Sequence, residues 1–179
     1  MEADNIILIS FGNFDQDMLD NAAGNTGHEF NIPVRIRDGN IDLSEFYDPS
    51  RRQYNGTTLL KKIDSDFAAD QTKTIAMFKV DLFIPILTYI FGQAYLNGRS
   101  GIVSVYRLSN ERYGLKPDTK ILTDRFRKEI IHELGHMFGL IHCSDPVCVM
   151  RSSTYVEDID QKSQSFCLSC REELRLKGL

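Results

Sequence analysis

The chain has 179 residues, with 21 Lys or Arg and 25 Asp or Glu, so its formal net charge is −4. A hydrophobic fraction of 42% and a charged fraction of 26% are typical of a soluble globular domain and argue against intrinsic disorder. The mild acidity, without a long run of Lys and Arg, gives no electrostatic basis for wrapping nucleic acid. We therefore expect one domain over residues 1–179 that binds neither DNA nor RNA.

The start of the chain and its most apolar stretch bear on location. Residues 1–11 have an early acidic pair and a short apolar run, with neither a basic leader nor a small-residue cleavage site. Residues 82–91 are the most apolar stretch, but they are interrupted by Pro85 and fall short of the roughly 20 residues that a bilayer requires. The sequence therefore predicts a cytoplasmic protein without a membrane span, and we expect a monomer.

Strand and helix periodicities alternate along the first two thirds of the chain. Strands are predicted at residues 5–11, 32–37, 74–80, 86–91 and 101–108. Helices are predicted at residues 14–23, ending at Gly24, and at residues 57–67, with an irregular polar segment at residues 48–56. This order favours an α/β fold of the α+β type, in which a mixed sheet packs with helices.

Residues 121–139, ILTDRFRKEIIHELGHMFG, have the period of an amphipathic helix. The apolar residues of its stripe lie four apart, at Phe126, Ile130, Leu134 and Phe138. Gly139 stands at the expected end of this helix, because a residue with positive φ lets the chain turn sharply. We divide the predicted domain at this glycine into an N-terminal sheet part, residues 1–139, and a C-terminal part, residues 140–179.

Three histidines gather around the end of this predicted helix. His132 and His136 are four residues apart, so their imidazoles lie on the same side of the helix, and His142 can return to the same ion after Gly139. Three neutral nitrogens hold Zn²⁺ and leave a fourth position for water, which is the arrangement of a catalytic site. Glu133 would then take a proton from the zinc-bound water and deliver it to the leaving amine.

All four cysteines follow the histidine motif, at Cys143, Cys148, Cys167 and Cys170. Their paired spacings suit a tetrahedral thiolate site, so we expect a closed structural zinc that pins residues 143–170 against the helix. The alternatives are two disulfides or a redox-active CxxC. Met150 lies eight residues beyond His142, where its thioether can pack beneath the imidazoles. The sequence therefore predicts two zinc ions per chain, one catalytic and one structural.

The stretch HELGHMFGLIH at residues 132–142, with Met150 downstream, resembles the metzincin metallopeptidases, in which a Met-turn underlies a three-histidine zinc site. Its continuation through the four cysteines resembles one branch of that clan, the archaemetzincins. The resemblance implies the same zinc ligands and the same general base as the spacing, with Met150 as the Met-turn. It also implies a twisted mixed sheet over an active-site helix, with an antiparallel edge strand along the cleft, for which residues 101–108 are our candidate.

We therefore predict a zinc-dependent metallopeptidase that hydrolyses peptide bonds in peptide or protein substrates. The alternative is a two-zinc peptide-binding or structural module with little or no catalysis, although such a module has no use for a carboxylate beside an open zinc position. Several metzincin branches place an oxyanion-stabilising Tyr two residues after the Met. Ser152 stands there in this chain and Tyr155 is out of register, so the sequence assigns no oxyanion donor.

Overall fold

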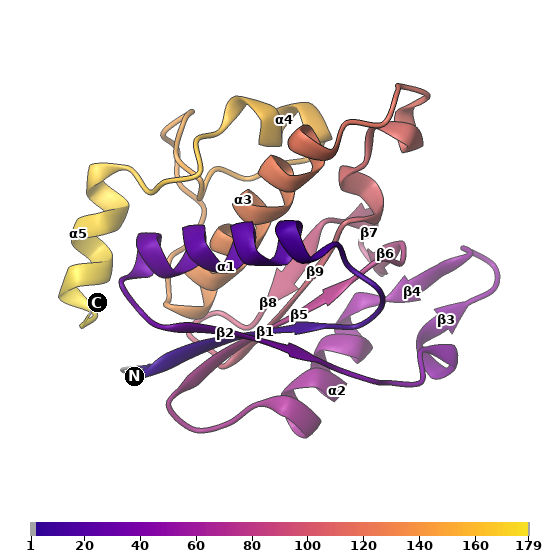
Figure 1. The fold of residues 1–179 in the computed structure, drawn as a ribbon, viewed down its shortest axis with the longest axis horizontal. Coiled ribbons are helices and arrows are strands. Elements are labelled where there is room, and N and C mark those ends of the chain that lie inside the picture. The colour runs from indigo at the N-terminus through magenta and orange to yellow at the C-terminus, as the bar shows by residue number, and fades with distance from the viewer. Residues whose placement is uncertain (1–2, 179) are drawn as a thin grey trace.

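A five-stranded mixed sheet forms the centre of the protein, with strand order β2-β1-β5-β9-β8 (Figure 1). The structure is a computed structural model that describes residues 3–178, so the outermost ends of the predicted domain and of its 1–11 segment lie outside it. Helices α1 and α3 cover one face of the sheet and α2 covers the other, with α4 and α5 on the α3 side. Within residues 3–178, no helix is both long enough and apolar enough to span a membrane.

Four strands of this sheet run parallel and the fifth, at one edge, runs antiparallel. The parallel strands are β1 (Asn5–Ser10), β2 (Val34–Asp38), β5 (Thr72–Phe78) and β9 (Ser100–Ser104), and the antiparallel one is β8 (Gly92–Ala94). A second sheet contains β3 (Tyr47–Asp48), β4 (Gln53–Asn55), β6 (Leu82–Ile84) and β7 (Leu87–Ile90). The helices are α1 (Gln16–Phe30), α2 (Gly56–Phe67), α3 (Thr119–Met137), α4 (Val156–Gln161) and α5 (Leu168–Leu176).

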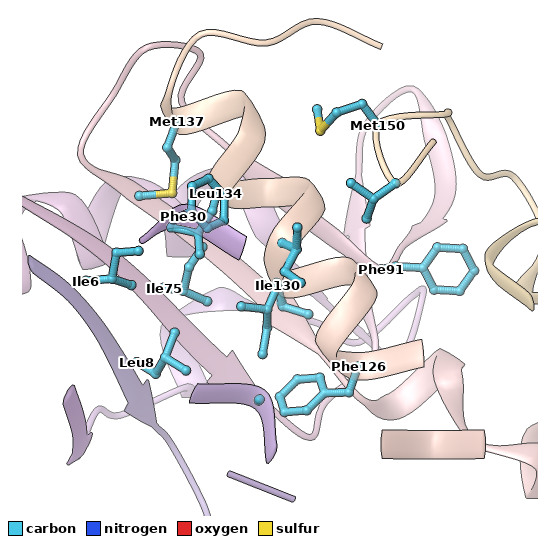
Figure 2. Packing of buried hydrophobic residues seen from close by; sticks show 14 of the residues in the cluster. Ile6, Leu8, Phe30, Ile75, Phe91, Phe126, Ile130, Leu134, Met137 and Met150 are labelled. Atoms are coloured by element: carbon cyan, nitrogen blue, oxygen red, sulfur yellow. The ribbon is translucent and has the colours of Figure 1, made fainter. Parts of the chain in front are cut away.

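The inner strands β1, β5 and β9 of the central sheet are largely buried, as expected for parallel strands covered by helices on both faces. On one face, Ile6, Leu8 and Ile75 pack with Phe126 and Ile130 of α3 (Figure 2). The opposite face packs against α2 through a separate apolar cluster. Because each fully buried Ile, Leu or Phe side chain contributes about 1.5–3 kcal/mol, this packing holds α3 firmly over the sheet. The predicted fold class, a mixed sheet packed with helices, is confirmed.

The strand predictions at residues 5–11, 32–37 and 74–80 and the helix prediction at residues 57–67 agree with β1, β2, β5 and α2, and residues 86–91 contain β7. The predicted end of the first helix at Gly24 is wrong. Helix α1 continues through Gly24 to Phe30, since the burial of Ala22, Thr26 and Phe30 against the sheet outweighs the cost of about 1 kcal/mol for an interior glycine. The segment at residues 48–56, predicted to be irregular, contains the two-stranded pairing of β3 with β4.

The prediction that residues 101–108 form the edge strand is also wrong. Strand β9 lies between β5 and β8, and all five of its residues are buried. The polar Ser104 fitted an alternating, solvent-facing pattern, but its Oγ donates to the Val80 carbonyl at 2.6 Å. Ser100 Oγ, at the start of β9, donates to Asp64 at 2.7 Å. Internal hydrogen bonds thus satisfy these hydroxyls without water. The antiparallel edge strand is β8.

Candidate active site and metal centres

Helix α3 carries most of the candidate site and is anchored at both ends. The Asp118 carboxylate accepts a hydrogen bond from the Ile121 amide at 3.0 Å and caps the first turn. At the other end, the Lys73 ammonium donates to the Met137 carbonyl at 2.9 Å. The negative end of the helix dipole stabilises a positive charge at this position. Gly139 has φ +89°, as predicted, and turns the chain back toward the helix.

The structure brings together the three predicted histidines. Ring nitrogens of His132, His136 and His142 all lie within 4.8 Å of one another. The Nε2 atoms of His132 and His136 are 3.1 Å apart. The ring centroid of His142 lies 5.3 Å from that of His132 and 4.9 Å from that of His136. His132 is buried, whereas His142 is exposed at the mouth of the site. One ion can therefore contact all three rings.

Backbone carbonyls fix the orientation of the two helical histidines. His132 Nδ1 donates to the Val149 carbonyl and His136 Nδ1 donates to the Leu140 carbonyl, each at 2.8 Å. A carbonyl oxygen only accepts, so Nδ1 carries the proton and the Nε2 lone pair is free for a metal. Burial lowers the pKa of all three imidazoles, His142 included. The rings are therefore held in the neutral form that binds metal, and the residues present fit a zinc ion.

Glu133 lies beside this histidine cluster with its carboxylate at the cleft. Its side chain is almost fully buried, and its carboxylate accepts no hydrogen bond from the residues that the structure describes. Burial raises the pKa of Glu133 well above the usual range, with a contribution from the neighbouring Glu129 charge and an opposing one from Lys162. A carboxylate free of protein partners is available to accept a proton.

Glu129 and Lys162 form a buried ion pair one helical turn before Glu133. Lys162 Nζ lies 3.2 Å from Glu129 Oε1 and donates to the Arg151 carbonyl at 3.1 Å. The pair therefore ties α3 to the chain directly after Met150. Sequence analysis did not find it, since the two residues are 33 positions apart and no local spacing joins them.

Lys162→Met should destabilise the protein by about 3–5 kcal/mol, because it leaves the Glu129 carboxylate buried without its partner. Urea unfolding followed by circular dichroism measures this change. The double variant Lys162→Met/Glu129→Leu should regain most of the loss, and the exposed Lys120→Met serves as control. An unfolding free energy equal to that of the control would show that the buried pair does not support the site.

Met150 is fully buried and lies beside α3 (Figure 2). A Cβ at Gly135 would overlap with Met150 Sδ, so the thioether occupies the space that this glycine leaves on the helix. The Met150 carbonyl accepts the Cys143 amide at 3.0 Å, and the preceding Val149 carbonyl holds His132. The turn containing Met150 thus contacts both clusters of potential metal ligands.

The four cysteines form a second cluster, with all Sγ atoms within 4.8 Å of one another. All four are free thiols, and the separations are 3.7 Å for Cys143–Cys167 and 3.8 Å for Cys148–Cys170. A disulfide has sulfurs about 2.05 Å apart, whereas a zinc tetrahedron with Zn–S bonds of about 2.3 Å has edges of about 3.8 Å. Amides of Asp145 and Met150 donate to Cys143 Sγ and Cys148 Sγ, each at 3.4 Å. The cluster fits a tetrahedral metal ion better than two disulfides.

Glu29, in the last turn of α1, holds the segment that carries the CxxC pair. Its buried carboxylate accepts the Phe166 amide at 2.9 Å and the Ser165 hydroxyl at 3.1 Å, and it pairs with Arg171 at 2.8 Å. These contacts lie on both sides of Cys167 and Cys170. The role of Glu29 cannot be predicted from local spacing, because its partners lie more than 130 residues away.

A cleft of about 470 Å³ opens beside the histidines. Its walls are β7, β8, the histidine face of α3 and the segment after Met150. Ser152 and Tyr155 both line it, and Tyr89 Oη donates to the Thr154 carbonyl at 3.0 Å, which joins β7 to that segment. The neighbouring wall is largely apolar, with Ile84, Leu87 and Phe91. The cleft thus combines three ring nitrogens that could hold a metal ion, a carboxylate with no hydrogen-bond partner among the described residues, and an accessible strand edge.

Known proteins are similar to this chain in fold and in sequence. The model of peptidase family M54 matches residues 30–176. The archaemetzincin of Pyrococcus horikoshii is 39% identical over 162 residues, which cover 87% of this chain and 85% of the relative. The archaemetzincin of Pyrococcus abyssi is 38% identical over 178 residues, which cover 94% of this chain and 93% of the relative. Among solved structures, Methanopyrus kandleri archaemetzincin has a TM-score of 0.85 at 30% identity, covering 98% of this chain and 95% of its own. A zinc-dependent peptidase from Methanocorpusculum labreanum has a TM-score of 0.82 at 29% identity, and the match covers 94% of this chain and 99% of that chain.

The fold, the histidine cluster and these relatives define a zinc metallopeptidase. The chain belongs to peptidase family M54, and its curated relatives are archaemetzincins. The resemblance to archaemetzincins and the predicted enzyme class are thereby confirmed.

Proposed function

We propose that the protein hydrolyses peptide bonds in the cleft between β8 and α3, with a zinc ion held by His132, His136 and His142. The observation that carries this proposal is the meeting of three imidazoles, two of them oriented by backbone carbonyls, and the Glu133 carboxylate, which has no hydrogen-bond partner within residues 3–178, at one cleft. When bound, zinc supplies Lewis acidity, which lowers the pKa of water to about 7 and polarises a carbonyl oxygen.

Glu133 is the general base in this proposal. Its carboxylate takes a proton from the attacking water as the water oxygen bonds to the carbonyl carbon. The C–N bond then breaks, and Glu133 returns the proton to the departing amine. The absence of hydrogen bonds to this carboxylate from residues 3–178 leaves its oxygens available for both transfers.

Strand β8 is the proposed docking edge for the peptide. Hydrogen bonds to β9 flank this strand on both sides, from the Ser104 amide to the Phe91 carbonyl at 2.9 Å and from the Tyr95 amide to the Ser100 carbonyl at 3.1 Å. In an antiparallel pair, bonds at these positions mean that the amides and carbonyls of Gly92 and Ala94 point away from β9. These groups face the free edge, where an extended peptide can pair as a further strand.

A second zinc ion, bound by Cys143, Cys148, Cys167 and Cys170, completes the proposal with two ions per chain. Its four thiolates leave no position for water, so this ion is structural. The Met150 turn and the Glu29 contacts carry its effect to the active site and to α1. These connections also support the proposal that residues 1–179 act as one domain.

Removal of zinc should abolish cleavage of a peptide library, and zinc added back should restore it. The chain is treated with a chelator, the metal content is measured, and products are identified by mass spectrometry before and after zinc addition. The alternative peptide-binding module retains peptides without cleaving them in the zinc-loaded form. Cleavage that persists in metal-free chain would contradict the proposed function.

A further inference from the structure

Gly92, on the edge strand β8, lies directly against the Glu133 carboxylate. A Cβ at Gly92 would lie 2.7 Å from Glu133 Oε1, 2.8 Å from Glu133 Cγ and 2.8 Å from the Ile102 carbonyl oxygen. Favourable contacts between nonbonded heavy atoms lie at about 3.5–4.0 Å, so even one methyl group would collide here. The backbone of Gly92 is not in the positive-φ region. Glycine is therefore required at this position because there is no room for a side chain, and not because of its backbone conformation.

The other residues of β8 show that this crowding is specific to the face toward α3. Side chains alternate along a strand, so positions 92 and 94 share one face and Gln93 points to the other. Gln93 Nε2 lies 3.4 Å from Thr57 Oγ1 in α2, on the opposite side of the sheet. A Cβ at Gly101 would lie 3.2 Å from Ala94 Cβ and 3.1 Å from Met137 Sδ of α3, so Ala94 lies on the α3 face. Only small residues of β8 thus face the active-site helix.

The carboxylate is the group that must yield if a side chain is added at Gly92. Ile102 belongs to β9, which is paired on both sides with β5 and β8, so its carbonyl cannot move away. Glu133 ends in a carboxylate with no hydrogen-bond partner among the described residues. A methyl group at position 92 would therefore displace this carboxylate first.

We infer that Gly92 is a positioning residue, whose missing side chain lets Glu133 lie beside the strand backbone that receives the peptide. The inference rests on the proposed role of Glu133 as the base. The Gly92 amide and carbonyl face the free edge, and a paired peptide strand would lie about 4.8 Å from β8. The peptide bond next to Gly92 is therefore the one that the carboxylate reaches.

The first test is the steady-state kinetics of Gly92→Ala. We expect kcat to fall by about 10²-fold, since a displacement of about 1 Å can cost that much, with KM and zinc content nearly unchanged. Gly24→Ala in α1 is the matched control, because nothing lies within 4 Å of a Cβ there. A raised KM with unchanged kcat would mean that the methyl group blocks the peptide instead. That result, or unchanged kinetics, would overturn the inference.

The second test does not depend on activity and compares thermal stability in two backgrounds. Gly92→Ala should lower Tm in the wild-type chain and lower it much less in a Glu133→Ala chain, where Oε1 and Cγ are gone. Equal losses of Tm in both backgrounds would place the conflict with the Ile102 carbonyl alone and contradict the inference. A wild-type chain that fails to cleave peptides would refute the proposed function. The comparison of Tm in the two backgrounds would still measure the contact between position 92 and the Glu133 side chain.

Discussion

Glu133→Ala should lower kcat for peptide cleavage by about 10²–10⁴-fold while the zinc content of the chain stays unchanged. This range is the usual contribution of a positioned general base. The zinc content is preserved because the three histidine rings and their carbonyl partners, Val149 and Leu140, do not involve the Glu133 side chain. Quenched time-course assays on a defined peptide measure kcat, and metal analysis of the same samples measures the zinc content.

The isosteric variant Glu133→Gln separates the chemistry from the packing. Burial raises the pKa of Glu133, so the folded chain binds its proton more tightly than the unfolded chain, and ionisation at neutral pH destabilises the metal-free fold. The neutral amide removes this cost, and metal-free Glu133→Gln should unfold at a temperature no lower than that of metal-free wild type. The exposed Glu157→Ala in α4 is the control for both measurements. Cleavage by Glu133→Gln at the wild-type rate would eliminate the carboxylate as the base.

Cys167→Ala should reduce the metal content to one zinc per chain and lower the thermal stability. Structural zinc sites have apparent binding free energies of about 10–16 kcal/mol, so loss of the ion should cost the fold at least about 3 kcal/mol. For a chain of this length that lower bound corresponds to a fall in Tm of about 6–12 °C. In α5 only Cys170 and Leu174 are buried, so apolar packing does little to hold this helix without the ion.

The control for this variant is Val147→Ala, an exposed position between Cys143 and Cys148. Calorimetry gives Tm, and metal analysis gives the stoichiometry. The remaining zinc should stay with the histidines, since none of their ring contacts uses a cysteine side chain. Two zinc ions per chain with an unchanged Tm would show that the cysteines do not form the proposed structural zinc site.

The parts of the site that the sequence predicted depend on local spacing. His132 and His136 share a helix face because they are four residues apart, and Gly139 marks a turn because few other residues adopt positive φ. The cysteine cluster follows from short paired spacings. These signals need no knowledge of distant contacts, so they can be read before the fold is known.

The parts that sequence analysis missed depend on contacts between distant segments. Strand β8 has only three residues, Gly-Gln-Ala, which carry no strand periodicity, and only pairing with β9 makes it the edge. The roles of Glu29 and of the Glu129–Lys162 pair appear only when the chain is folded. Gly92 likewise has meaning only beside the Glu133 side chain.

X-ray diffraction of zinc-loaded crystals, measured on both sides of the zinc absorption edge, tests the central claim most directly. We predict two anomalous peaks per chain. One should lie about 2.0–2.1 Å from a ring nitrogen of each of His132, His136 and His142, with no fourth protein ligand, and the other about 2.3 Å from the four cysteine sulfurs. A peak at the histidines that excludes His142, or one whose fourth position is filled by a protein side chain, would contradict it.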